Sequence, residues 1–246
     1  MSGRRGGGIV EATVFALAGV AILIGLGIWQ LDRKVWKENL IATITARIER
    51  APQPLPAPAD WARLTPVADE YRHVTFPAEF LPGQEALVYT AGSAFRPDVH
   101  GAGYWVFAPA RLAGGSIVVI NRGFVPADRK DAAARGQGAP QKSVDIVGVM
   151  RWPDQPGLFT PQAEPQNNVW YLRDSTAIAA AKTWNTSAPF YIEQESPAPP
   201  GDLPKPGKLT VALPDNHLQY AITWFALALG LTGVYVTWLT GRLRRA

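Results

Sequence analysis

The chain has 246 residues, with 24 basic and 20 acidic side chains, no cysteine, and methionine only at positions 1 and 150. Without cysteine it can form neither disulfide bonds nor a thiolate Cu(I) site, and its three histidines show no zinc-ligand spacing. Setting aside five tail arginines and Glu11 leaves 19 basic and 19 acidic residues between positions 32 and 217. This neutral central segment excludes a basic nucleic-acid footprint.

The first predicted element is a membrane span. Residues 12–31 are 20 consecutive residues without a charge, and about 20 apolar residues cross a bilayer core as a helix. The run is too long for the apolar region of a secretion signal, and charged residues follow it in place of a cleavage site. We therefore expect a retained anchor whose basic tail meets anionic membrane lipid.

A helix is expected to extend the first span over residues 34–50, because apolar residues recur there near one stripe. Prolines at positions 52, 54, 56 and 58 should end this helix and form a stiff linker. A second proline-rich linker is expected at residues 197–206, where the chain returns to the membrane.

The segment between the linkers is predicted to be mostly antiparallel β structure, either a sandwich or a small barrel. The apolar even positions from 74 to 80 should share one face of a strand. The expected strands lie at residues 72–80, 87–89, 104–107, 117–120, 144–150 and 190–192. One helix is expected at residues 174–184, capped by Asp174.

Three short segments are expected to be irregular. Residues 121–126 should be a turn after a buried strand, with a bulge at Gly123, an end of pairing at Pro126 and Arg122 bonded to strand-end carbonyls. The glycines at 101 and 103 indicate another turn, and residues 129–138 a mobile hairpin tip.

The last predicted element is a second span over residues 218–241, which are 24 residues without a charge. The fold class is thus an α+β membrane protein in which two transmembrane helices flank a β domain. The five tail arginines are matched by five basic residues near the spans on the loop side, so the positive-inside count is tied. Because a loop this long crosses a membrane largely regardless of its charge, we expect the central domain outside the cytoplasm. The expected divisions are a tail at 1–9, a span at 10–31, a helical extension and linker at 32–59, a β-rich domain at 60–196, a linker at 197–216, a span at 217–240 and a tail at 241–246.

His217 is the leading candidate for chemistry. On a helix it shares one face with Tyr220, Ala221 and Trp224, which places an imidazole above small and aromatic neighbours. Such an imidazole at the membrane rim could serve a haem iron as an axial ligand. The alternative is an interfacial histidine within an ordinary belt of Tyr and Trp.

The first span offers a facing surface of small residues, with a matching pair of glycines in the second span. These residues are Ala21, Gly25, Gly27, Gly230 and Gly233. Near the outer rim lie Trp29, Gln30, Arg33, Trp36 and Lys37. They are either an interfacial anchor or a site where Arg33 or Lys37 pairs with the carboxylates of a bound amphiphile.

No hydrolytic, phosphate-loop or dinucleotide motif is present, and we expect no enzymatic activity. Over nearly its whole length the chain instead resembles the Surfeit locus protein 1 family, which assists assembly of haem-copper cytochrome c oxidase. The similarity rests on Gly27-Ile28-Trp29-Gln30-Leu31, Tyr71-Arg72-His73-Val74, Val119-Ile120-Asn121-Arg122-Gly123-Phe124-Val125-Pro126, Trp170-Tyr171, Arg173-Asp174, and Asn216-His217-Leu218-Gln219-Tyr220-Ala221 with Thr223-Trp224-Phe225. Phe124 and Asp215 depart from the usual Trp and Asn and leave this framework intact.

The resemblance implies a bacterial inner-membrane protein, with its domain in the periplasm, that binds haem a and helps to deliver it to oxidase subunit I. The implied iron ligand is His217. The remaining candidate cofactor-binding residues are Tyr220, Trp224, Trp29, Gln30, Arg33 and Lys37. The expected partners are subunit I and membrane lipid, with haem a synthase as a further candidate and no nucleic acid. The alternative function is a scaffold that stabilises nascent subunit I without holding haem.

Overall fold

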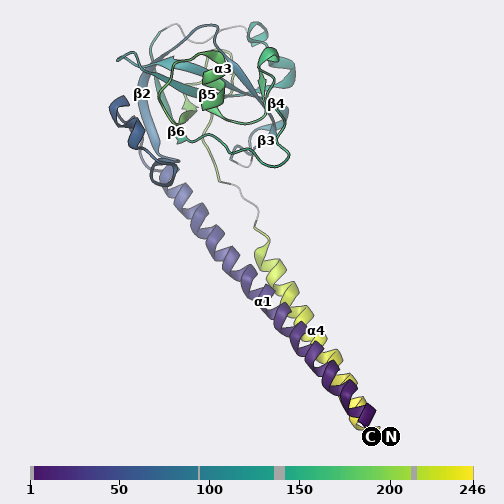
Figure 1. Ribbon diagram of the computed structural model, residues 1–246. Coiled ribbons are helices and arrows are strands. Elements are labelled where there is room, and N and C mark those ends of the chain that lie inside the picture. Colours follow the sequence, from purple (N-terminus) through teal and green to yellow (C-terminus); the bar gives the residue numbers. More distant parts are fainter. Residues whose placement is uncertain (1–2, 94, 136–141, 212–214, 246) are drawn as a thin grey trace. The chain divides into compact units, whose positions relative to one another are not determined.

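The computed structural model describes residues 3–93, 95–135, 142–211 and 215–245, and it contains two compact units (Figure 1). The first unit comprises Met1–Ala42 and Pro214–Ala246, and the second is Thr43–Leu213. Each unit has its own architecture. The expected fold class is confirmed, because an apolar helix at each end of the chain flanks a β domain.

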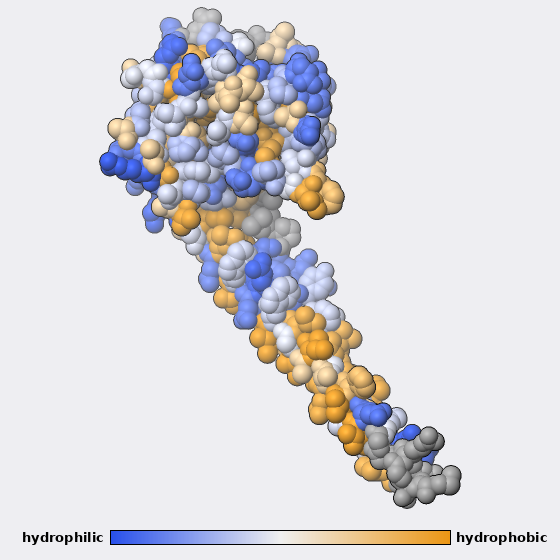
Figure 2. Space-filling view, in the orientation of Figure 1, coloured by the Kyte–Doolittle hydropathy of each residue, from blue (hydrophilic) through white to orange (hydrophobic). Residues whose placement is uncertain are grey.

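The first unit is an antiparallel pair of helices, α1 (Gly3–Ile48, as far as Ala42) and α4 (His217–Leu243), which lie side by side in Figure 1. Among the described residues, two helices are long and apolar enough to cross a membrane, Gly8–Ile48 and His217–Leu243. Figure 2 shows hydrophobic surface along much of this pair. Near one end, the hydroxyls of Thr13 and Tyr235 lie 2.5 Å apart.

Close approach of the two helices depends on two glycines of α1. A methyl group on Gly27 would lie 2.5 Å from the Phe225 ring, and one on Gly19 would lie 2.9 Å from Leu231. The expected contact role of Gly27 is therefore confirmed. The same expectation is wrong for the glycines at positions 25, 230 and 233, where an added methyl group would meet nothing within 4 Å. Periodicity placed small residues on helices but did not identify the faces that meet.

The second unit is a β domain whose sheet closes on itself. Within the described residues eight strands form one sheet: β1 (Gln53–Pro54), β2 (His73–Phe80), β3 (Ala86–Gly92), β4 (His100–Arg111), β5 (Ile117–Pro126), β6 (Val144–Arg151), β7 (Val169–Trp170) and β8 (Tyr191–Ser196). Their order is β1-β2-β6-β8-β5-β4-β3-β7, and β2 also pairs with β4. The strands β2, β6, β8, β5 and β4 thus form a ring, which is the small barrel among the two expected architectures.

Most strand pairings are antiparallel, but β1–β2, β3–β7 and β5–β8 are parallel. Alternation along β5 shows how the sheet is buried on both faces. Val118 and Ile120 join a cluster that takes side chains from all five ring strands, whereas Val119 joins a second cluster on the opposite face. Helix α3 (Ser175–Lys182) covers this second cluster with Ile178.

Both predicted helices of this region are confirmed. Two backbone N–H groups, of Thr176 and Ala177, donate to the Asp174 carboxylate that caps α3. The extension of α1 runs to Ile48, where Ile44 and Ile48 are buried with Val149 and Leu209. A short helix, α2, spans Pro66–Asp69. Short 3₁₀ segments lie at Pro58–Arg63, Ala127–Arg129, Ala132–Arg135 and Pro165–Asn167.

The expected turn at residues 121–126 is wrong, because β5 continues through it to Pro126. The bulge is confirmed at Gly123, where φ is +119° and the register against β4 shifts. Asn121 stabilises this bulge, since its side chain accepts from the Gly123 N–H and donates to Glu193 of β8. Arg122 pairs with Glu85 at 3.0 Å, and among the described residues it donates to no strand-end carbonyl.

Two other irregular segments also differ from expectation. The glycines at 101 and 103 belong to strand β4 and not to a turn. In the expected hairpin tip, Ala132–Arg135 is a 3₁₀ turn, and the buried Arg135 donates to Glu85 at 2.6 Å. Residues 136–138 of that tip lie outside the described residues.

Arg96 holds the returning segment of the chain against the barrel. Its side chain is 1 % exposed and donates to the backbone carbonyls of Lys205, Pro206 and Gly207 as well as to Asp98. The hydrogen bonds from Arg96, and then from Lys205, hold the pKa of Asp98 well below its usual range. Stability from this carboxylate is present above its unfolded pKa and declines as the pH falls through about 4.

We predict that Gly123→Ala destabilises the β domain by at least about 2 kcal/mol. The added methyl group would lie 2.1 Å from the Lys205 carbonyl oxygen, and the positive φ disfavours any residue with a side chain. Thermal unfolding of the detergent-solubilised full chain, followed by tryptophan fluorescence, measures the change.

Gly114→Ala is the matched control, because its methyl group would meet nothing within 4 Å and its φ is not in the left-handed region. Equal midpoints for the two variants would contradict the assigned role of the bulge.

Candidate functional site

The first candidate site lies where the two helices of the first unit meet at His217. The Nδ1 atom of His217, at the start of α4, lies 2.7 Å from the Oε1 atom of Gln30 on α1. Because an amide oxygen can only accept, the imidazole donates its Nδ1–H. The backbone N–H of His217 donates to the Asp215 carboxylate at 3.0 Å. Both the ring and the helix start are therefore held by hydrogen bonds.

The other ring nitrogen of His217 is available for a ligand. In the neutral tautomer with a proton on Nδ1, Nε2 carries a lone pair and cannot donate. Among the residues that the structure describes, no hydrogen bond is formed to this Nε2 atom. A half-buried imidazole with one nitrogen bonded to a second residue and the other vacant is the arrangement of a metal-ligating histidine.

The remaining predicted site residues differ in how exposed their side chains are. On α4, Ala221 is buried and Trp224 half-buried, whereas Tyr220 is exposed. On α1, Trp29 and Arg33 are exposed and Lys37 is half-buried. The Arg33 guanidinium stacks 4.2 Å over the Trp36 ring. The structure brings together His217 with Gln30, and Arg33 with Trp36.

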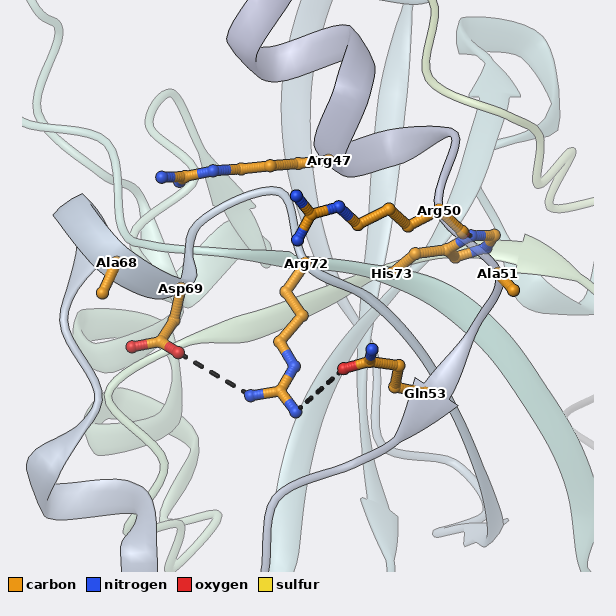
Figure 3. Close-up of a pocket in the computed structure, with 8 residues that line it drawn as sticks. All are labelled: Arg47, Arg50, Ala51, Gln53, Ala68, Asp69, Arg72 and His73. Carbon is orange, nitrogen blue, oxygen red and sulfur yellow. Dashed lines mark hydrogen bonds and ion pairs between the residues drawn. The ribbon is translucent and has the colours of Figure 1, made fainter.

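The second candidate site is a basic pocket within the β domain, which sequence reasoning missed. It encloses about 330 Å³ and is lined by Arg47, Arg50, Ala51, Gln53, Ala68, Asp69, Arg72 and His73 (Figure 3). The arginines come from the end of α1, the segment after it, and the residue before β2. A spacing of three residues predicts that Arg47 and Arg50 lie close together on a helix. That Arg72 lines the same pocket is seen only in the folded structure.

Neither site is a protein-only metal centre. Within the described parts of the chain, no group of three or more His, Cys, Asp or Glu side chains could hold a metal ion. A metal at His217 would therefore need most of its coordination from a prosthetic group, as the iron of a haem has.

These features define a class: a β-barrel domain flanked by two apolar helices, with an imidazole held between the helices. Within the curated relatives, the chain is 34 % identical over 236 residues to a SURF1-like protein of Monosiga brevicollis, covering 92 % of this chain and 85 % of the relative. It is 33 % identical over 218 residues to Surfeit locus protein 1 of Rattus norvegicus, covering 84 % and 69 %. The human Surfeit locus protein 1 is 32 % identical over 218 residues, covering 83 % and 69 %.

A model of the SURF1 family matches residues 17–229. The chain belongs to the SURF1 family, whose members are generally known as cytochrome oxidase assembly factors and are not a known class of enzyme. The two apolar helices are consistent with a membrane protein. These relatives are eukaryotic and give no support for a bacterial or periplasmic location.

We predict that cysteines replacing Gln30 and His217 will be joined by a short bis-thiol-reactive crosslinker, because these side chains are in contact. The chain has no cysteine of its own, so any crosslink comes from the introduced pair. After protease cleavage within the central domain, the two helix fragments should stay joined on a denaturing gel.

The control pairs Gln30→Cys with Leu218→Cys, since Leu218 is exposed and one residue turns a helix by about 100°. Equal yields from both pairs would contradict the assigned helix faces.

Proposed function

We propose that this protein binds haem a through His217 and assists its delivery to subunit I of cytochrome c oxidase. The observation that carries the proposal is the bonded pair of His217 and Gln30, which leaves Nε2 with a lone pair and no partner among the described residues. Haem a supplies an iron that accepts an axial nitrogen ligand, together with a long hydrocarbon tail and two carboxylates. The chain's own residues suit each of these parts.

Gln30 acts in this proposal as a positioning residue. Its amide oxygen accepts the Nδ1–H of His217, which selects the tautomer with the lone pair on Nε2 and fixes the plane of the ring. This hydrogen bond also makes the imidazole a better metal ligand, as a hydrogen bond to a neighbouring acceptor generally does for metal-ligating histidines. Loss of such a partner typically weakens metal affinity by about 10- to 100-fold.

The apolar surface of the helices suits the hydrocarbon part of the ligand. Tyr220 and Trp29 are exposed aromatic side chains on the two helices, and Trp224 is half-buried below His217 on α4. Arg33 is the proposed partner for a haem carboxylate, because its stacking on Trp36 orients the guanidinium while leaving it exposed. Lys37, one turn further along α1, is the second proposed cationic contact.

A scaffold for nascent subunit I is the alternative function, and one observation favours it. Large apolar side chains along both helices face outward, including Phe15 at 78 % and Leu229 at 75 % exposure. Such surfaces can pack against the helices of another membrane protein. Subunit I is the proposed partner in both cases, with haem a synthase as a further candidate for the haem-binding case.

The proposed location is the bacterial inner membrane, with the central domain in the periplasm. The support is the five arginines of the short tails together with the length of the central segment, because a long loop crosses a membrane largely regardless of its charge. A periplasmic reporter fused after Arg135 should therefore be active, and one fused after Ala246 inactive. Activity at Ala246 would overturn this topology.

We predict that the full chain, purified after co-expression with haem a synthesis, shows a Soret band that His217→Ala abolishes or shifts. Loss of an axial ligand changes the electronic state of the iron directly, whereas replacing one side chain at a helix end should change protein yield little. Gln30→Leu should keep the band but weaken haem retention by about 10-fold or more, measured by transfer to apomyoglobin.

Gln219→Leu is the control for Gln30, because Gln219 is exposed on α4 and its side chain has no partner among the described residues. A wild-type spectrum and retention in His217→Ala would refute the ligand assignment. Such a result would favour the scaffold.

A further inference from the structure

The basic pocket of the β domain carries more positive charge than its surroundings neutralise. Arg47, Arg50 and Arg72 contribute three guanidinium groups, and Asp69 is the only carboxylate among its described lining residues. Figure 3 shows the Arg50 side chain lying along the pocket and the Arg72 guanidinium directed toward Asp69 and Gln53. A surplus of two positive charges in a concave site attracts an anion.

Two arginines are held in place by neutral acceptors. Arg47 donates to the backbone carbonyls of Glu70 and Val67, both at 2.9 Å, and so holds the end of α2. Arg72 donates to the side-chain oxygen of Gln53 at 3.3 Å. A carbonyl or amide oxygen orients a guanidinium without cancelling its charge, so the Arg47 charge remains in the pocket, whereas Arg72 also pairs with Asp69 at 3.8 Å.

Of the three acidic groups near the pocket, only Asp69 pairs with one of its arginines among the described residues. One oxygen of Asp69 accepts the Thr65 N–H at the start of α2, and the other lies 3.8 Å from Arg72. Glu70 pairs with Arg151, and Glu195 lies 3.1 Å from the Nε2 atom of His73. Asp69 therefore offsets one arginine charge of the pocket, whereas Glu70 and Glu195 pair with residues other than its three arginines.

Arg50 is the clearest sign of a ligand site. Its guanidinium has no hydrogen-bond or ion-pair partner among the described residues, yet its backbone is fixed because its carbonyl accepts from His73 Nδ1 at 2.8 Å. Such a planar fork, which lines the same pocket as Arg47 and Arg72, can form charge-assisted bonds to a bound anion.

We propose that this pocket binds a small soluble molecule through a phosphate group or a pair of carboxylates. The cavity of about 330 Å³ matches a small ligand. Phosphate and carboxylate are the groups whose oxygen spacing fits the arginine fork. The site lies within the β domain and is independent of the proposed haem ligand.

The test titrates the full chain, in a neutral detergent and phosphate-free buffer, with inorganic phosphate and with succinate at ionic strength matched by chloride. Calorimetry should show saturable binding of at least one anion, and the melting temperature should rise with it. Arg50→Gln and Arg72→Gln should each weaken binding by roughly 5- to 10-fold, which allows for solvent exposure of the pair. The double variant should show no saturation.

Arg63→Gln is the matched control, because its side chain is 85 % exposed and its one ion pair among the described residues is with Asp60. It should bind like the wild type. If Arg72→Gln unfolds, Arg50→Gln alone tests the proposal, since the Arg50 guanidinium has no partner within the described part of the chain.

Three results would overturn the proposal. The first is no saturable binding of either anion, and the second is equal weakening by Arg63→Gln, which would indicate general charge attraction. The third is binding of an acidic peptide, tri-glutamate, when neither phosphate nor succinate binds. That outcome would assign the pocket to a protein segment.

Discussion

The hydrogen bond between Gln30 and His217 aligns the two terminal helices at the end where α4 begins. Two apolar helices gain little by associating with each other in lipid, so specific polar contacts and close packing must align them. At one end Thr13 bonds to Tyr235, and at the other Gln30 bonds to His217. Between these two bonds, Gly27 admits the Phe225 ring. Together these contacts set the register and rotation of both helices, and with them the direction in which the free imidazole nitrogen points.

A different constraint organises the β domain. A five-stranded ring can close only if its strands bend, and a bulge supplies a bend without breaking the sheet. In β5 the bulge at Gly123 leaves room for the Lys205 carbonyl, which pairs with Phe124. Asn121 bonds to the Gly123 N–H and to Glu193, so a single side chain ties the bulge to the neighbouring strand. Arg96 then fixes the returning segment through the same region.

Sequence patterns were sufficient wherever one element's own periodicity decides the structure. The uncharged runs predicted both apolar helices, alternation from Val74 to Phe80 predicted a strand face, and Asp174 predicted a helix start. Sequence patterns failed where contacts with a distant segment of the chain determine the local structure. Asn121 and Gly123 are typical turn residues, but β4, β8 and Lys205 supply partners that keep them in a strand. Likewise, no local pattern tells that Gly27 meets a ring while Gly25 meets nothing.

The basic pocket shows the same limit for electrostatics. Between residues 32 and 217 the positive and negative charges cancel, and this net neutrality concealed a local excess of positive charge in the pocket. Screening over a distance of about 10 Å makes local geometry, and not net charge, decide what a site attracts. Arg47 and Arg72 are 25 positions apart in the chain, and they line one cavity because the end of α1 and the start of β2 belong to the same unit. A domain with no net charge can therefore hold a selective anion site, provided that its acidic side chains pair with other residues. Glu70, for example, pairs with Arg151.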